Sequence, residues 1–395
     1  MRSTNLYLSV LWCLLLPAAL AGCGGNTTIS GALPPAPIVP PSTPTPTPAP
    51  TPAALTSSRF LYGVISFEAE GGFFGGTIDS VTGKVTPAAG SPTANVLGQN
   101  IVIQVLADPK GRFLYTLNIG ASSFGVQFGR IGIGGYQINR SSGRLTPEPG
   151  EIIFPEQRLG LMAIDGTGRF LYQPNGSGID TYSINQVTGQ LTIMPFTIPA
   201  PAVGTSTAAS ADGRFLFNAG NGLVEVYGIN STNGQLSVAA TPVSTGGSAG
   251  PMAVSADTRF LYVANPIQGT VAVYLIGPNG SLVLQSGSPF PTDLMAAGMS
   301  LSPDGKFLYM TFQNGVESHV KGFAVNPLAG SFTPIAGATV ADANGINVDG
   351  SGKFAYVAQI QLSTFKIDSA TGALTLASQA AQPVTDLPTD IVLVP

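Results

Sequence analysis

The chain has 395 residues, only 9% of them are charged, and its formal net charge is −4. Such a weak acidic balance argues against a nucleic-acid partner. With one histidine in the whole chain, a histidine-rich zinc site is excluded, and we expect neither metal nor cofactor. Glycine (50 residues) and proline (33 residues) are abundant, which is typical of many short strands joined by turns.

Residues 1–22 predict an export signal. Arg2 precedes an apolar stretch from Leu6 to Leu20 that is too short to span a membrane. The following Leu-Ala-Gly-Cys, which ends at Cys23, resembles the bacterial lipoprotein cleavage box. The resemblance implies that Cys23 becomes the lipidated first residue and attaches the protein to a membrane. The alternative is an ordinary signal peptide with a chance cysteine.

The implied location is the cell envelope, outside the cytoplasm. Gly24 follows Cys23, which by resemblance to the sorting rules of two-membrane bacteria favours the outer membrane where the organism has one. Cys13 leaves with the leader, so the mature chain cannot form an internal disulfide.

Residues 23–57 form the predicted spacer between anchor and folded domain. Ten prolines lie between positions 34 and 52. At ~3.1 Å per residue, a polyproline-like rod of this length spans about 60 Å. Plain disorder without a spacing function is compatible with the same composition.

One short phrase, Arg/Lys-Phe-Leu/Ala-Tyr/Phe, returns seven times at intervals of 45 to 57 residues. Its copies begin at Arg59, Arg112, Arg169, Arg214, Arg259, Lys306 and Lys353. This period fits a four-stranded blade far better than a helical pair. The sequence therefore predicts an all-β, seven-bladed β-propeller of four-stranded antiparallel blades over residues 58–395, and we expect a monomer.

The residues around each phrase supply the other strands. An apolar run closed by an Asp/Gly turn precedes the phrase, as in Met252 to Asp257, and predicts the innermost strand. Equivalent turn aspartates are expected at Asp108, Asp165, Asp212, Asp304 and Asp349. Alternating segments with an aromatic two places before an aliphatic, such as Tyr182 and Ile184, predict third strands. Gly-containing turns then lead to Thr/Val/Leu-rich fourth strands.

The first blade lacks an innermost strand, because no apolar run precedes Arg59. The unpaired candidate is the C-terminal segment from Ile391 to Val394. We therefore expect the C-terminal strand to complete blade 1 and close the ring, which removes its open edges.

The repeats resemble those of the seven-bladed lactonase family, whose members include bacterial 6-phosphogluconolactonase. The resemblance lies in the phrase (fullest from Arg259 to Asn265), the Ser-Pro-Asp-Gly turn that ends at Gly305, and the Asp-x-x-x-Gly-x-Leu-Thr hairpins such as Asp368 to Thr375. It covers residues 59 to 395. It is specific for the fold and weakly specific for activity, because the matching residues build blades.

A binding site is expected at the mouth of the central channel. There the loops from second to third strand meet those from one blade's outermost strand to the next blade's innermost strand, and we call this side the loop face. Nearly all cations belong to blade scaffolding, and Lys321 and Lys366 fall in third strands away from the channel. The candidate ligand-binding residues are Arg130, Glu68, Glu70, Asp293, Asp342, Asp390 and His319.

Catalysis, if present, is expected from Glu151, Glu156 and Arg158. A carboxylate could activate water while the arginines, with Arg130, hold an anionic lactone. Solvated loop charges in weak surface pairs are the simpler interpretation. No Gly-x-Ser-x-Gly elbow is present, and His319 fits a histidine at a strand edge.

Two functions follow from these residues. The preferred one is a non-catalytic binding or scaffold module that recognises a small molecule, polymer or protein at the loop face. The alternative is an exported lactonase of the 6-phosphogluconolactonase type. Two candidate arginines are few for a phosphorylated sugar lactone, which demands several converging cations.

Overall fold

The computed structural model describes residues 59–65, 72–91, 93–94, 100–123, 126–128, 132–150, 152–154, 160–200, 206–313, 318–341, 343, 345–358, 362–380 and 390–395. The expected leader (1–22), the lipidation site Cys23 and the spacer (23–57) lie outside these residues. A compact unit spans Pro52–Pro395. In the described part of the chain, no helix is long and apolar enough to cross a membrane.

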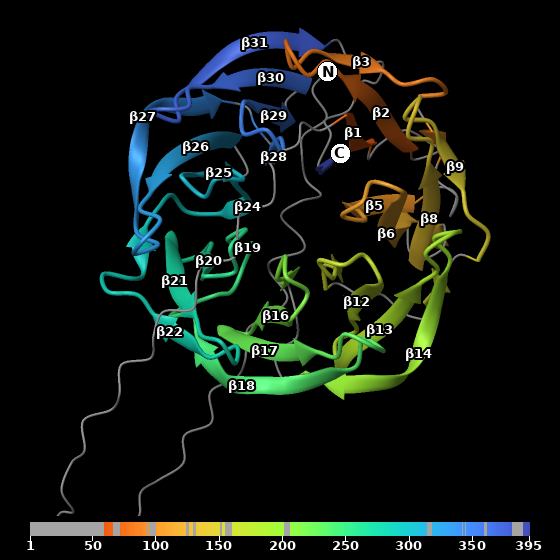
Figure 1. The fold of residues 1–395 in the computed structure, drawn as a ribbon, viewed down its shortest axis with the longest axis horizontal. Helices are drawn as coiled ribbons and strands as arrows, with labels where there is room; N and C mark the ends of the chain where they lie inside the picture. Colours follow the sequence, from red (N-terminus) through yellow and green to blue (C-terminus); the bar gives the residue numbers. More distant parts are fainter. Residues whose placement is uncertain are drawn as a thin grey trace, which may run out of the picture. The chain divides into compact units, whose positions relative to one another are not determined.

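Seven antiparallel sheets surround one axis (Figure 1), which confirms the predicted propeller. Each blade is given from its innermost to its outermost strand. Blade 1 contains β32 (Ile391–Val394), β1 (Phe60–Ile65), β2 (Gly72–Ile78) and β3 (Val85–Pro87). Blade 2 contains β5 (Asn100–Ala107), β6 (Phe113–Ser123), β8 (Gly132–Ile138), and both β9 (Leu145–Pro147) and β10 (Ile152–Ile153). Blade 3 contains β11 (Ala163–Ile164), β12 (Phe170–Pro174), β13 (Gly178–Ile184) and β14 (Leu191–Pro199).

The other four blades repeat the pattern. Blade 4 contains β15 (Ser206–Ala209), β16 (Phe215–Gly220), β17 (Leu223–Ile229) and β18 (Leu236–Ser244). Blade 5 contains β19 (Met252–Val254), β20 (Phe260–Asn265), β21 (Thr270–Ile276) and β22 (Leu282–Leu284). Blade 6 contains β24 (Ala296–Leu301), β25 (Phe307–Gln313), β26 (Ser318–Val325) and β27 (Phe332–Ala341). Blade 7 contains β28 (Gly345–Val348), β29 (Phe354–Ala358), β30 (Leu362–Ile367) and β31 (Leu374–Ala380).

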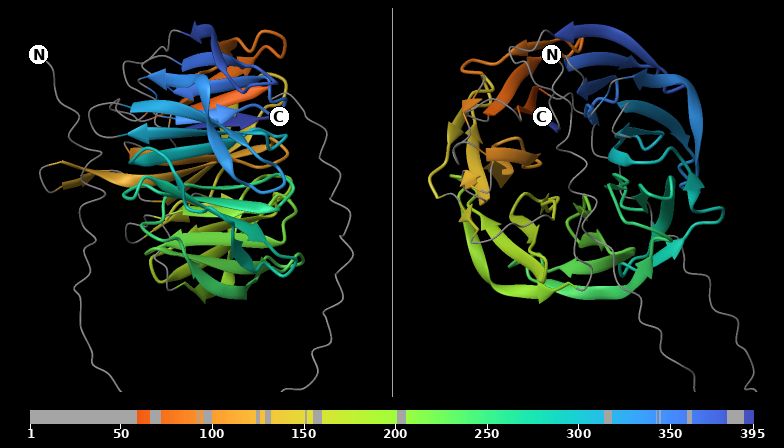
Figure 2. Two further views of the ribbon diagram at one scale, coloured as in Figure 1. Left: turned by 90° about the vertical axis from the view of Figure 1, so that its left-hand side faces the viewer. Right: turned by 180° about the vertical axis from the view of Figure 1, so that it is seen from behind.

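Three short strands add to this frame. They are β4 (Thr93–Ala94), β7 (Val126–Phe128) and β23 (Phe290–Pro291). The strand β7 pairs with the far end of β6, and this hairpin projects beyond the ring (Figure 2).

The C-terminal strand closes the ring as predicted. β32 pairs antiparallel with β1, with Phe60 opposite Val394 and Gly63 opposite Ile391. It also lies beside β28 of blade 7 and β5 of blade 2. Blade 1 is therefore built from both ends of the folded chain.

The repeated phrase joins neighbouring blades. At the seam between blades 2 and 3, Gly189 occupies the left-handed region (φ 83°) directly under the ring of Phe113, and a Cβ there would lie 2.5 Å from Phe113 Cδ1. The Tyr115 hydroxyl donates to the Gly189 carbonyl at 2.6 Å. Glycine is required here because it alone permits both the conformation and the approach. The other six seams repeat this packing, with the pairs Phe60/Gly143, Phe170/Gly234, Phe215/Gly280, Phe260/Gly330, Phe307/Gly372 and Phe354/Gly83.

The turns between first and second strands are of two kinds, which corrects the expected equivalence of their aspartates. In blades 2, 3 and 7 a buried aspartate accepts the backbone N–H groups of the phrase, as Asp108 accepts that of Phe113 at 2.9 Å. In blades 4, 5 and 6 a serine takes this place: Ser210 Oγ accepts the N–H of Phe215 and donates to Asp212. The two arrangements differ because a carboxylate only accepts hydrogen bonds, whereas a serine hydroxyl also has a proton to donate, which the aspartate two residues later accepts. We call the side that carries these turns and the third-to-fourth-strand turns the turn face.

Candidate functional site

The structure describes three of the predicted site residues, Asp293, His319 and Asp390. Seven others lie outside the described residues: Glu68, Glu70, Arg130, Glu151, Glu156, Arg158 and Asp342. The described side chains of the loop face therefore define the candidate site.

An ionic cluster lies on the loop face at blade 6. Asp293 belongs to the connection between β23 and β24, and His319 is the second residue of β26. Asp293 Oδ2 lies 2.7 Å from His319 Nε2, and Lys321 Nζ lies 2.8 Å from Oδ1 and 2.6 Å from Oδ2. One carboxylate thus holds both side chains. Lys321, placed away from the channel by sequence analysis, belongs to this cluster.

Packing and charge fix the state of this cluster. The His319 ring stacks on Phe312, which is buried on β25, with centroids 5.3 Å apart and an interplanar angle of 25°. Partial burial alone would raise the pKa of Asp293. Hydrogen bonds and positive charge from Lys321 and His319 outweigh that effect and hold the pKa below its ordinary value. Asp293 is therefore ionised at neutral pH and orients the histidine through Nε2.

Asp390 lies at the start of β32, between blades 1 and 2. Its carbonyl accepts the N–H of Val64 at 3.0 Å, and its Oδ2 accepts the N–H of Val105 at 2.9 Å. Burial raises the pKa of the carboxyl group to about 6, although hydrogen bonds from the backbone of Val105 and Ile391 act in the opposite direction. A carboxyl group that titrates near neutral pH thus lies at the innermost strand of the loop face.

Other innermost strands are joined in the same way. The Gln104 side chain of blade 2 donates to the Met162 carbonyl of blade 3 at 3.0 Å and accepts the Met162 N–H at 2.6 Å. Asn347 of blade 7 donates to the Ile391 carbonyl of blade 1 at 3.0 Å. Among these links, the one made by Asp390 uses an ionisable group, which costs more desolvation than an amide.

Two buried carboxylates, Asp180 and Glu225, were not among the residues predicted from the sequence. They occupy the same position of the third strand in blades 3 and 4, two residues before Tyr182 and Tyr227. Both are at most 5% exposed. An acidic residue at a position that holds Ala272 in blade 5 was a visible signal, since acidic residues are rarely fully buried unless paired.

Each of these carboxylates has polar partners. Asp180 Oδ1 accepts from Asn175 Nδ2 and from Thr197 Oγ1, both at 2.9 Å. Glu225 Oε2 accepts from Asn218 Nδ2 at 2.9 Å and from the Tyr227 hydroxyl at 3.0 Å. Both groups lie toward the loop-face ends of their strands.

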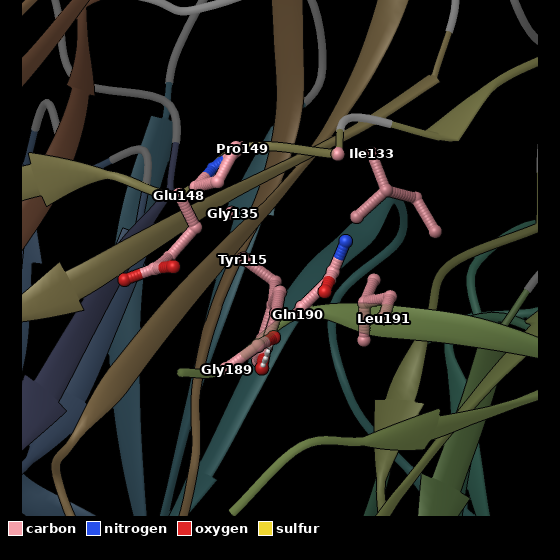
Figure 3. Close-up of a pocket in the computed structure, with 9 residues that line it drawn as sticks. Tyr115, Ile133, Gly135, Glu148, Pro149, Gly189, Gln190 and Leu191 are labelled. Carbon is pink, nitrogen blue, oxygen red and sulfur yellow. Dashed lines mark hydrogen bonds between the residues drawn. The ribbon is translucent and has the colours of Figure 1, made fainter. Parts of the chain in front are cut away.

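A small hollow lies in the seam between blades 2 and 3 (Figure 3). Tyr115, Glu148, Gln190 and Leu191 contribute to its lining, and the Glu148 carboxylate points away from Gln190. Burial raises the pKa of Glu148. The hollow has room for about one water molecule, so it is too small for a sugar or a lactone.

The chemistry available on the described loop face is that of carboxylates and one oriented histidine. In the described residues, no group of three or more His, Cys, Asp and Glu side chains is placed to hold a metal ion. Asp293 with His319 could accept a proton from water, and Asp390 could do so above its pKa of about 6.

The chain is similar to known proteins in sequence and in structure. The family model described as Lactonase, 7-bladed beta-propeller matches residues 171–288 and 206–388. A search of curated proteins gave no match.

Solved structures share the fold at low sequence identity. A periplasmic gluconolactonase of Pseudomonas aeruginosa is 21% identical, with a TM-score of 0.66, over 86% of this chain and 99% of that one. A Lactobacillus plantarum protein is 18% identical (TM-score 0.66), over 86% of this chain and all of that one. A candidate 6-phosphogluconolactonase of Bacteroides fragilis is 19% identical (TM-score 0.64), over 87% of this chain and all of that one. At these identities the likeness shows the fold alone.

Proposed function

The chain belongs to the seven-bladed β-propeller lactonase family, and we propose that it is a lipid-anchored member of the cell envelope that binds a ligand at its loop face without hydrolysing it. The ligand class that suits this face is a neutral, hydroxyl-rich or cationic molecule. A lipid on Cys23 would attach the protein to the membrane.

The observation that carries this proposal is the use of the cations. Eleven cationic side chains flank the turns of the turn face, and on the described loop face Lys321 is ion-paired with Asp293. A phosphorylated sugar needs several converging cations. The described loop face instead holds the carboxylate of Asp390, which suits hydroxyl and ammonium groups as hydrogen-bond donors.

The anchoring part of the proposal is supported by the Leu-Ala-Gly-Cys sequence that ends at Cys23. Cys23→Ala removes the thiol that a lipid would modify, so the protein should lose labelled palmitate and become extractable from membranes by high salt. Retention of the label in this variant would refute the anchor.

Ligand binding is tested by calorimetry with three probes: glucosamine, which is cationic, glucose, which is neutral, and glucose 6-phosphate, which is anionic. Glucosamine and glucose should bind more tightly than the phosphate. Asp390→Asn should weaken the glucosamine complex by about tenfold, as expected for the loss of one charge-assisted hydrogen bond. In the same preparations, a pH-stat should show no hydrolysis of glucono-1,5-lactone above the uncatalysed rate. Preference for the phosphorylated sugar would refute the proposed ligand class.

Lactone hydrolysis is the second candidate, and the Asp293–His319 pair favours it. Since Asp293 holds Nε2, Nδ1 would take a proton from water as the water oxygen attacks the lactone carbonyl. The tetrahedral intermediate would then release the ring oxygen, which takes the proton back from the histidine. Lys321 would stabilise the oxyanion.

The two candidates differ in one assay. If the wild type hydrolyses glucono-1,5-lactone, His319→Ala should lower kcat by about 10²-fold, the usual effect of losing a general base. Glu156→Gln and Arg158→Ala test the placement suggested by sequence. Hydrolysis that survives His319→Ala but is lost in Glu156→Gln and Arg158→Ala would place the reaction at Glu156 and Arg158.

A further inference from the structure

The two faces of the propeller differ in charge. Eleven cations flank the turns of the turn face against eight aspartates, whereas the rest of the chain after Cys23 holds four cations and twelve acidic residues. Three of the eight aspartates, Asp108, Asp165 and Asp349, are at most 2% exposed, so their charges are covered by protein. The turn face is thus basic in a chain that is acidic overall.

Much of this positive charge gathers on the turns of blades 1 and 2. Its exposed members are Arg59, Lys84, Lys110, Arg140 and Arg144, which we call the basic patch. The seam contacts of Phe60 with Gly143 and of Gly90 with Arg144 hold the two sets of turns together. The aspartates of these turns are Asp79 and the buried Asp108, which is paired with Arg112.

An exposed aliphatic side chain accompanies the basic patch. Val81 is 84% exposed and lies at the tip of the turn that also carries Lys84. The corresponding tips of blades 3 and 6 hold Val187 and Leu328, and these three are the most exposed large hydrophobic side chains of the described residues. Aliphatic tips among cations are typical of surfaces that insert into lipid headgroups.

The chain also reaches the propeller at the basic patch. Arg59 directly precedes β1, on the turn face of blade 1. Residues 23–58 would link the proposed lipid at Cys23 to this position. A lipid on Cys23 would therefore tether the propeller from this part of the turn face.

We propose that the basic patch docks the propeller on an anionic lipid surface, with Val81 inserted among the headgroups. The direction of the tether rests on the proposed anchor, whereas the charge and the exposed valine do not. Docking on this side leaves the loop face directed away from the lipid, where it can meet its ligand.

The expected strength follows from the charges. Each basic side chain close to an anionic membrane raises the binding constant by about fivefold, and added salt screens this effect. Arginines of other blades contribute less where their guanidinium groups donate to neighbouring turns, as those of Arg214 and Arg259 do.

The test is co-sedimentation of the chain from position 23 onward, carrying Cys23→Ser, with vesicles of phosphatidylglycerol in phosphatidylcholine or of phosphatidylcholine alone. Binding should require phosphatidylglycerol and weaken with salt. The triple change Lys84→Ser, Lys110→Ser and Arg140→Ser should weaken binding by about 10²-fold. Val81→Ser should weaken it by a few-fold, and this loss should persist at high salt, because it removes apolar contact.

The matched control also lowers the net charge by three, on turns of blades 4 and 5: Ser231→Glu, Gln235→Glu and Ala256→Glu. It should retain most of the vesicle binding. Equal loss in both triple variants, or binding that ignores phosphatidylglycerol, would overturn the proposal. Selective binding to soluble polyglutamate would overturn it too, in favour of an acidic polymer. These outcomes do not depend on the proposed function. The Cys23→Ser chain carries no lipid, and sugar binding at the loop face is measured in a separate experiment.

Discussion

The turn face and the loop face of this propeller are built on different rules. On the turn face, all seven seams place a left-handed glycine under the phenylalanine of the preceding blade. Around the channel, neighbouring innermost strands are joined by side chains that differ from seam to seam: an amide from Gln104, an amide from Asn347 and, at the loop face, the carboxylate of Asp390. Among the described residues, the buried Thr207 hydroxyl of blade 4 has no hydrogen-bond partner.

The difference separates stability from function. The phenylalanine–glycine contact of the turn face recurs at every seam, and each copy stabilises the ring in the same way. The loop face instead keeps groups that cost stability, such as the Asp390 carboxylate with its raised pKa. Groups of this kind gather at functional sites, because a shifted pKa is useful in binding and proton transfer.

Deletion of residues 391–395 should produce the largest effect, because β32 serves both faces. Its loss exposes the edge of β1 and leaves a gap between β28 and β5, which β32 otherwise fills. It also removes Val394 and Pro395 from beside Gly111. We expect aggregation, or a fall in melting temperature of several degrees, measured by circular dichroism and size-exclusion chromatography. Leu393→Ala is a milder control that leaves the strand in place. An unchanged melting temperature with monomeric elution would show that the ring closes without β32.

The fold was predictable from the sequence because its signals are local and repeated. The phrase that begins at Arg59 marks every second strand, and the absence of an apolar run before it pointed to Ile391 and Val394 as the missing strand. The turn aspartates were predictable as turn residues. Their two hydrogen-bonding modes were not, because Ser210 and Asp108 play one role with different side chains.

The site was less predictable because its contacts join distant residues. Asp293 and Lys321 are 28 residues apart, and the assignment of Lys321 to a third strand did not show that Asp293 reaches it. The packing of Phe113 on Gly189 spans 76 positions, and each residue alone fits an ordinary strand or turn. Periodicity reports which side of a strand is buried but not which neighbour covers it.

A pair of carboxylates on the loop face should respond to pH with opposite signs. The folded-state pKa of Asp390 is raised to about 6, so ionisation of this carboxyl group is unfavourable in the folded protein. The protein therefore loses stability as the pH rises from about 4 to 6. Asp390→Asn should therefore stabilise the protein by about 2 kcal/mol at pH 7 and by little at pH 4. Urea unfolding at both pH values measures this difference, and equal stability of both proteins at pH 7 would contradict it.

Asp293 is the matched comparison, because its pKa is lowered. Its charged form contributes stability at neutral pH that is lost as pH falls toward the folded-state pKa. Asp293→Asn should therefore destabilise the protein at pH 7, by less than about 1 kcal/mol, since the pair is partly solvated. A gain in stability from both changes would show that the loop-face carboxylates are merely unfavourable charges.

The smallest expected effect distinguishes one seam of the turn face from the others. The Tyr172 hydroxyl donates to the Gly234 carbonyl at 3.1 Å, as equivalent tyrosines do at three other seams. At the closing seam, Thr364 Oγ1 lies 3.3 Å from the Gly83 carbonyl, and the buried Tyr356 hydroxyl has no hydrogen-bond partner among the described residues. Tyr172→Phe should therefore cost about 1 kcal/mol in urea unfolding. Tyr356→Phe should be neutral or slightly stabilising, because it removes an unsatisfied buried group. Equal losses would show that the Tyr356 hydroxyl is hydrogen-bonded in solution, so that the closing seam matches the four seams that have this tyrosine bond.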